Sequence, residues 1–334
     1  MSSGRSWIRT TLKASTAVVG AAACALAVFV GYQSWPRTIA VAHYEEPGLD
    51  YRLPPADPSG PDIRIGVFTT SHADVSEGLL FNGGDWLKQA RSVTSGLLVR
   101  HPRATFLFEG GVGSRIQGEF ERNFNGWQRA LFAHVYERPV LEQLRSAGVD
   151  PATIAFLLIT HLHWDHAGVI KDFPGTKVRV TREEFDGASK AAARGEVGTF
   201  AEQFNDPAIQ WDFVRFADAS FGPFRKSLDL FDDGSVVLVP LAGHTQGQLG
   251  MFLTLKSGER YFFIGDASWS AKAVGIPRER IPFARDMVDA DPEAARRELV
   301  LIHRIAQANP RLHVIPVHDG EALEALPKLA RLAS

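Results

Sequence analysis

The sequence contains a single cysteine, Cys24, in a chain of 334 residues. The rest of the chain therefore forms no internal disulfide and offers no thiolate as a nucleophile or a metal ligand. An excess of one charge is also missing, because 36 Lys and Arg against 38 Asp and Glu leave a formal net charge of −2. Binding to phosphate backbones usually requires a basic face, so nucleic acid is not an expected partner.

Charged side chains are also absent between Ala14 and Pro36. The centre of this stretch, residues 16–32, is almost wholly apolar or small and approaches the roughly 20 residues that a helix needs to cross a bilayer. Three cations precede it, Arg5, Arg9 and Lys13. A positive flank of this kind predicts that residues 1–13 stay in the cytoplasm and that the remainder is exported.

Three interpretations of residues 14–36 compete: an uncleaved membrane anchor, a cleaved signal peptide and a buried helix of the globular domain. Residues 25–27 imitate a small-residue cleavage site, but the apolar run continues to Val30, which favours retention. A lipoprotein attached at Cys24 would lack the usual bulky residue before it. We therefore expect a membrane-anchored protein whose main domain lies in the periplasm or at the cell surface, or is secreted if the segment is cleaved.

Residues 37–61 are rich in proline, glycine and acidic residues, which predicts a linker, so the folded domain is expected over residues 62–334. In this domain short β-type runs alternate with helical stretches, which predicts an α/β fold. Strands are expected at 63–69, 96–99, 105–108, 154–160, 177–180, 235–241, 260–264 and 312–317. Helices are expected at 132–147 and 294–308, the second after the cap Asp291-Pro292-Glu293.

The region between residues 182 and 233 is less regular and rich in aromatic side chains. One interpretation is a helical layer that buries these rings against the sheet, as most aromatic residues in globular proteins are buried. The other is a lid or pocket wall over the active site. The two are compatible for different residues.

The densest group of potential metal ligands follows an apolar run at residues 154–159. The next residues after Thr160 are His161-Leu162-His163-Trp164-Asp165-His166. Neutral imidazoles and carboxylates are ligands of zinc, at roughly 2.0–2.2 Å. On a strand-to-loop turn, His161 and His163 can point into one site while Asp165 and His166 reach a second.

Three later strands each lead into a side chain of the same kind, namely His244, Asp266 and His318. Open α/β sheets bind ligands at the carboxyl ends of their strands, where the loops converge. A lone histidine is more often structural, and we assign no role to His43, His72, His101, His134, His303 or His313. The joint pattern, with glycine before His244 and Asp266, predicts a metal site.

In this order, the HxHxDH cluster, Gly243-His244-Thr245, Gly265-Asp266 and the final His318 resemble the metallo-β-lactamase superfamily over about residues 62–325. The resemblance implies a four-layer αβ/βα sandwich with a dinuclear site between two sheets. It also implies two metal positions that share one bridging residue. The first would be held by His161, His163 and His244, the second by Asp165, His166 and His318, with Asp266 bridging both.

Within the superfamily, the sequences around these ligands look most like acyl-homoserine lactonases and related lactone or ester hydrolases. Two positions differ from those lactonases. Trp269 stands where they usually carry a tyrosine that helps to hold the substrate carbonyl, and an indole can donate only from its ring nitrogen. Glu109 stands where an Asp often braces the metal loop.

The expected function is hydrolysis of a small ester or lactone, with two zinc ions as cofactors, or iron or manganese instead. Two cations about 3.5–4 Å apart can share a hydroxide near neutral pH. Asp266 would pass a proton to the leaving group. Trp164 and Trp269 would wall a small-molecule pocket, or else pack against the metal loops. The alternatives are β-lactam, thioester (glyoxalase-type) or phosphodiester hydrolysis, a di-iron redox protein, and a non-catalytic metal-binding protein at the membrane.

Overall fold

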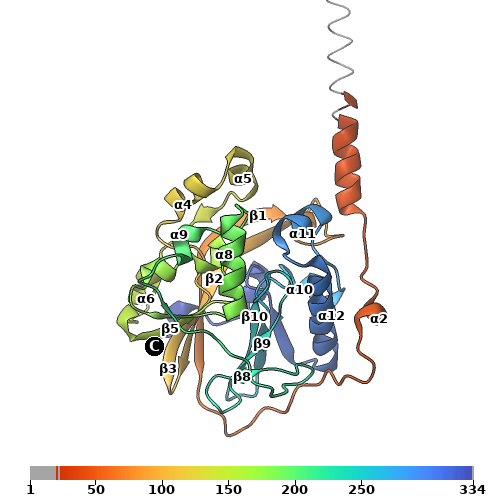
Figure 1. Ribbon diagram of the computed structural model, residues 1–334. Coiled ribbons are helices and arrows are strands. Elements are labelled where there is room, and N and C mark those ends of the chain that lie inside the picture. Colours follow the sequence, from red (N-terminus) through yellow and green to blue (C-terminus); the bar gives the residue numbers. More distant parts are fainter. Residues whose placement is uncertain (1–19, 22, 333–334) are drawn as a thin grey trace, which may run out of the picture.

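Two β-sheets pack face to face with helices on their outer sides (Figure 1). The computed structural model describes residues 20, 21 and 23–332. The seven-stranded sheet has the order β4-β1-β2-β3-β5-β6-β7, and the five-stranded sheet has the order β12-β11-β10-β9-β8. The strands are β1 (Arg64–Ser76), β2 (Gln89–His101), β3 (Ala104–Phe108), β4 (Val135–Tyr136), β5 (Ile154–Leu158), β6 (Lys177–Arg179), β7 (Gln210–Trp211), β8 (Leu228–Asp229), β9 (Val236–Pro240), β10 (Leu249–Thr254), β11 (Arg260–Phe263) and β12 (Leu312–Ile315).

Most helices are short and lie in the connections between strands. The α-helices that follow the amino-terminal one are α2 (Val41–Tyr44), α3 (Glu77–Leu80), α4 (Ile116–Asn123), α5 (Gly126–Leu131), α6 (Val140–Ser146), α7 (Trp164–Ala167), α8 (Arg182–Ala193), α9 (Ala201–Phe204), α10 (Ala271–Gly275), α11 (Pro282–Val288), α12 (Pro292–Ala308) and α13 (Gly320–Glu324). The predicted cap of α12 is confirmed, because the Asp291 carboxylate accepts from the backbone N–H groups of Glu293 and Ala294.

The core consists of apolar layers on both sides of each sheet. In β2, Leu97 and Val99 point into the cluster between the sheets, whereas Leu98 points into the cluster under α6 and α8. This alternation follows from the period of two along a strand. Both faces are buried, so the central strands read as continuous apolar runs in the sequence. A third cluster lies between the five-stranded sheet and α12, and the predicted sandwich of two sheets between helices is confirmed.

The helix predicted at residues 132–147 is wrong in its extent. Phe132 ends α5, residues 135 and 136 form β4, and α6 begins only after Pro139. A proline in the interior of a helix removes a hydrogen bond and clashes with the preceding turn, so the helix cannot run through residue 139. Strand β10 was not predicted, although all six of its residues are buried and it pairs with both β9 and β11.

The aromatic-rich region between residues 182 and 233 is partly a packed helical layer and partly a wall of the site, the two interpretations left open by the sequence. Phe204 lies in the apolar cluster beneath α8 and α9, and Phe185 packs against it and against Trp211. The loop between these two helices instead runs past the metal loop, where Gly198 accepts a hydrogen bond from the Trp164 N–H. The region is therefore mostly a packed outer layer, and one loop reaches the site.

The expected membrane anchor at residues 14–36 falls partly on residues 1–19 and 22, which lie outside the described residues. Residues 20, 21 and 23–34 are helical and largely exposed. Within the described part of the chain, none of the helices has the length and apolar character needed to cross a membrane. Residues 37–61 run along the domain, where Ile39 is buried against the α12 layer and the Leu53 N–H donates to the Asn309 side chain.

The backbone at residues 112–113 touches the backbone at Gly168, just after the loop that carries the histidine cluster (residues 161–166). A Cβ at Gly168, which follows α7, would lie 2.6 Å from the Gly113 nitrogen and 3.0 Å from the Val112 Cα. Gly168 has ordinary helical angles, so this crowding alone requires a glycine there. The close approach holds the chain after β3 against the loop that carries the histidine cluster.

We expect Gly168→Ala to lower the free energy of unfolding by about 1–3 kcal/mol, because backbone must move to admit the methyl group. Gly126→Ala, at the start of α5, is the matched control, since no atom lies within 4 Å of its added Cβ and alanine favours helices. Urea denaturation of both variants measures the difference. Equal stability of the two variants would show that the Gly113–Gly168 approach is not tight.

Candidate metal centre

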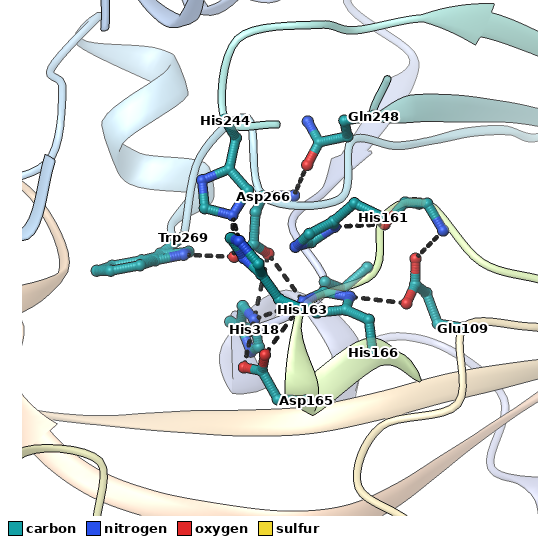
Figure 2. Close-up of polar contacts among 12 residues, drawn as sticks. Glu109, His161, His163, Asp165, His166, His244, Gln248, Asp266, Trp269 and His318 are labelled. Atoms are coloured by element: carbon teal, nitrogen blue, oxygen red, sulfur yellow. Dashed lines mark hydrogen bonds and ion pairs between the residues drawn. The ribbon is translucent and has the colours of Figure 1, made fainter. Parts of the chain in front are cut away.

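The structure brings all seven predicted ligand residues together at one end of the sandwich (Figure 2). The parallel pairing of β3 with β5 and of β11 with β12 places the carboxyl ends of these strands at the same edge of each sheet. The loops that follow the strands then converge between the two sheets. The seven residues are His161, His163, Asp165 and His166 after β5, His244 after β9, Asp266 after β11 and His318 after β12.

Six of these side chains form two groups. In the first group, His161, His163 and His244 each offer a ring nitrogen, and these atoms lie within 4.8 Å of one another. The second group contains Asp165, His166 and His318 under the same limit. In the second group the Nε2 atoms of His166 and His318 are 3.2 Å apart, and an Asp165 oxygen lies 3.5 Å from the His318 Nε2.

Asp266 lies between the two groups. Its Oδ1 atom is 3.1 Å from the His318 Nε2 and 3.5 Å from the His166 Nε2. Its Oδ2 atom is 3.5 Å from the His244 Nε2, so the two carboxylate oxygens face different groups. This arrangement agrees with the bridging position expected for Asp266.

The hydrogen bonds on the outer side of the histidines leave their inner nitrogens free to bind a cation. The His318 Nδ1 lies 2.6 Å from the Val93 carbonyl oxygen, which can only accept, so Nδ1 carries a proton and Nε2 is the ring atom that faces the cluster. The His166 Nδ1 lies 2.7 Å from Glu109 Oε2 and is fixed in the same way. The two Nε2 atoms face each other across 3.2 Å, so two lone pairs would repel there unless a proton or a metal cation lies between them.

Two further atoms point to the same requirement. The His161 Nε2 and the Asp266 Oδ1 are buried, and neither has a hydrogen-bond partner among the residues that the structure describes. A buried polar atom without a partner costs about 1–3 kcal/mol, so such atoms call for a ligand. The donor set of imidazole nitrogens and carboxylate oxygens therefore fits divalent cations.

Burial and mutual charge shift the titration of these groups. Burial, together with the neighbouring imidazoles, holds the pKa of His161 and of His163 well below the ordinary value, which keeps both rings neutral. Burial opposes charge on His166 as well, but the carboxylates of Glu109, Asp266 and Asp165 raise the pKa of His166 to about 10. Burial would also raise the pKa of Asp266, yet the charges of His318 and His166 hold it well below its usual range. The carboxylates of the site therefore favour positive charge on His166, a place that a bound cation would take over from the proton.

Glu109 supports the cluster from the end of β3. Its Oε2 pairs with the His166 Nδ1, and its Oε1 accepts the Thr160 N–H at 2.8 Å, so one carboxylate holds both a ligand and the strand end before it. Its φ of 62° is unusual for a residue other than glycine and marks a strained position. The bracing role expected for Glu109 has a clear geometric basis.

Asp289 and Arg280 also support the ligands, and sequence reasoning missed both. Asp289 Oδ1 lies 2.8 Å from the His244 Nδ1 and accepts from Arg280 Nη1 at 3.0 Å. Another nitrogen of Arg280 donates to the Asp266 carbonyl oxygen. Neither residue follows a strand or matches a short motif, so only the path of the chain around α11 brings them to the site.

Glu184 joins two of the ligand-bearing loops. Its buried carboxylate accepts from the Leu162 N–H at 2.8 Å, from the Thr245 hydroxyl at 2.5 Å and from the Gly247 N–H at 3.2 Å. Burial raises the pKa of Glu184, and these three donors oppose that shift. The spacing from Thr181 to Glu184 is that of a helix capping box. The Glu184 side chain instead turns inward to the loops, which the sequence does not reveal.

An apolar cavity opens directly beside the cluster and reaches Asp165, His163, His244 and His318. Among the apolar side chains that line it are Leu79, Leu80, Leu131, Phe132, Phe283 and Met287. Trp269 lines the cavity while its Nε1 donates to Asp266 Oδ2 at 2.8 Å. Trp164 lines it too, and its ring also packs against Phe120, Phe124 and Phe200. Both tryptophans thus combine the packing and the pocket-wall positions weighed from the sequence.

Known proteins share this fold. The profile of the Metallo-beta-lactamase superfamily matches residues 90–304. The N-acyl homoserine lactonase AttM of Rhizobium johnstonii is 24% identical over 188 residues, which are 53% of this chain and 67% of that protein. A solved N-acyl homoserine lactone hydrolase, with the product N-hexanoyl-L-homoserine at its catalytic metal center, has a TM-score of 0.59 at 15% identity and covers 80% of this chain and 97% of its own. The dizinc quorum-quenching lactonase AidC has a TM-score of 0.50 at 15% identity and covers 78% and 88%.

We expect Glu184→Gln to lower the free energy of unfolding by about 1.5–3 kcal/mol, because the new amide nitrogen would face the donor N–H of Gly247. Glu183→Gln is the control, since this neighbour on the same helical turn is exposed. Thermal and urea unfolding measure both effects. If the two variants are equally stable, Glu184 does not tie the loops together.

Proposed function

The chain belongs to the metallo-beta-lactamase superfamily, and from this premise we propose that it hydrolyses a small ester or lactone at a pair of divalent metal ions. Its fold and its relatives are those of metal-dependent hydrolases. The observation that carries the proposal is the position of Asp266, whose two oxygens face two separate groups of ligand-type side chains. One carboxylate between two groups is what a dinuclear centre requires.

In this proposal the first metal position is formed by His161, His163 and His244, and the second by Asp165, His166 and His318. Zinc is the proposed metal, because the donors are imidazoles and carboxylates and because the similar lactonase AidC is described as dizinc. Iron or manganese would accept the same donors. Two such cations, when bound, supply the acidity that makes water a nucleophile near neutral pH and the positive charge that polarises a carbonyl.

The residues around the cluster fix its geometry and handle the proton. Trp269 donates its N–H to Asp266 Oδ2, which orients the carboxylate. Asp266 is then placed to carry a proton to the leaving oxygen of the substrate. Arg280 lies over the Trp269 ring at 4.4 Å and donates to the Asp266 carbonyl, so it holds both residues in place. Because the Trp269 N–H is already used, this residue does not replace the substrate-holding tyrosine of the lactonases.

The cavity favours a neutral, apolar substrate over an anionic one. Among the described residues that line it there is no Lys or Arg, and most are apolar. A phosphodiester or the carboxylate of a β-lactam would therefore meet no fixed cation of the chain. The resemblance to N-acyl homoserine lactonases points in the same direction.

The test is a panel of lactones, esters, thioesters and β-lactams offered to the full-length purified chain, with and without a chelator. We expect turnover of uncharged esters or lactones that carry an apolar group, loss of activity with the chelator and recovery with zinc. Turnover of β-lactams alone, or activity that survives complete metal removal, would contradict the proposal.

We expect Asp266→Asn to stay folded, bind at least one metal more weakly and lose activity by several orders of magnitude, because both positions depend on its charge. Glu109→Gln is the comparison, since a residue that only supports a ligand typically costs about 10–100-fold. Activity on the best panel substrate and metal content by elemental analysis are measured for both. A near-normal rate for Asp266→Asn with two metals bound would show that Asp266 is not the bridge.

The cellular location follows from the amino-terminal segment, and we propose that it anchors the chain with the domain outside the cytoplasm. Support comes from the cations before the apolar run and from the exposed apolar side chains on the described part of its helix, such as Leu26 and Val28. Protease added to intact spheroplasts should then digest the domain. Full protection, with digestion only after lysis, would place the domain in the cytoplasm.

A further inference from the structure

Exposed apolar side chains stand on the segments that contribute to the wall of the apolar cavity. Large apolar side chains are usually buried in the folded protein. A contiguous group of them that stays exposed indicates an interaction surface. Four such residues stand on the elements that enclose the cavity, and we call them the rim. The rim consists of Leu87, Trp127, Leu131 and Phe283, which are 94%, 54%, 41% and 37% exposed.

Each rim residue is tied to the cavity by its place in the fold. Leu131 and Phe283 line the cavity directly. Trp127 lies in the same short helix as Leu131, α5. Leu87 lies in the loop that folds back on α3, where the Trp86 carbonyl accepts from the Ser76 hydroxyl, and α3 contributes Leu79 and Leu80 to the lining.

The amino-terminal helix is fixed to this same end of the molecule. The Phe29 ring meets the Phe283 ring edge-on, with 6.1 Å between their centres. The Phe283 N–H donates to the Gln33 side chain at 2.9 Å, and the Asn82 side chain donates to the Gln33 carbonyl at 2.9 Å. These contacts join the helix to α11 and to the β1–β2 connection. Figure 1 shows the helix rising from the end of the domain where α5 and α11 lie.

We propose that the rim rests on a phospholipid bilayer and that the substrate is an acyl-chain amphiphile that enters the cavity from the lipid. This proposal rests on the proposed hydrolase function. The uncharged run at residues 16–32 is continuous with the helix held against Phe283, so the chain that leaves the rim is itself suited to lipid. Trp127 supplies the aromatic ring that favours the headgroup region of a bilayer.

This arrangement gives an amphiphile a direct path to the site. Its acyl chain would move from the bilayer, past Leu131 and Phe283, into the apolar lining, while its ester group reaches the cluster at His163 and Asp165. Hydrolysis consumes one water, breaks the acyl carbon–oxygen bond and leaves a carboxylic acid and an alcohol. The rim thus couples substrate capture to a surface, which a soluble short-chain ester does not need.

The first measurement locates Trp127 in proteoliposomes that contain the full-length chain. Wild type and Trp127→Phe are compared in phosphatidylcholine with and without brominated acyl chains, which quench indole fluorescence on contact. We expect the fluorescence component lost in Trp127→Phe to be quenched by the bromolipid. An unquenched component would overturn the proposal whatever the enzyme hydrolyses.

The second measurement compares two substrates in the same liposomes, para-nitrophenyl palmitate dissolved in the bilayer and para-nitrophenyl butyrate in solution. We expect Leu87→Gln combined with Trp127→Gln to lower palmitate turnover about tenfold, since two apolar contacts with lipid are lost, and to leave butyrate turnover unchanged. Lys256→Gln is the control, because it lies in the exposed turn between β10 and β11, at the opposite edge of the sheet from the cluster.

The outcomes separate this inference from the proposed function. Turnover of neither ester, together with a quenched Trp127, would reject ester hydrolysis and support the lipid contact. Equal palmitate turnover by wild type and the double variant would overturn the lipid contact while the hydrolase function stands. A cross-linked dimer in the liposomes that the double variant abolishes would show that a second copy covers the rim, and would also overturn it.

Discussion

The position of the Asp266 carboxylate between two groups of imidazoles is the constraint on which the rest of the site depends. Its two oxygens lie 3.1–3.5 Å from ring nitrogens of both groups, and it is buried. A buried carboxylate is stable only with compensating positive charge or donors. Trp269 supplies one donor, and Oδ1 has no hydrogen-bond partner within the described chain. The fold therefore holds a buried carboxylate at the point where the ligand-type nitrogens of both groups meet.

Ligand geometry of this kind depends on loops that cannot drift, and three buried carboxylates hold them. Glu109 joins the end of β3 to His166, Glu184 joins the loop at Leu162 to the loop at Thr245, and Asp289 joins His244 to Arg280. Each accepts hydrogen bonds from two or three donors, so their burial is compensated. The ligands thus lie on loops, but these hydrogen bonds fix the loops relative to the strands that precede them.

The apolar cavity and Trp269 are the two features of the site that bear on substrate selection. The family resemblance leads to the expectation of a tyrosine at this position that holds the substrate carbonyl, whereas the Trp269 N–H donates to Asp266. Substrate selection then depends more on shape and apolar contact along the cavity. One of the rim residues, Phe283, also packs against Phe29 of the amino-terminal helix, so the apolar surface at the cavity is continuous with that helix.

Local pattern was enough to predict an α/β fold and a cluster of metal-type side chains, because apolar runs and the polar residues that end them stand in consecutive positions, whereas the sandwich of two sheets was expected from the family resemblance. The strand before His161 and the strand before Asp266 were recognisable for this reason, as was the capped helix α12. The failures have equally physical causes: Pro139 stops a helix whose spacing otherwise continues, and β10 is buried on both faces without a motif at its end. Glu184, Arg280 and Asp289 act through contacts across 9 to 63 positions of the chain. Such contacts form only when the sheets pack together. They could not be predicted, because hydrogen bonds between distant residues produce no periodic pattern in the sequence.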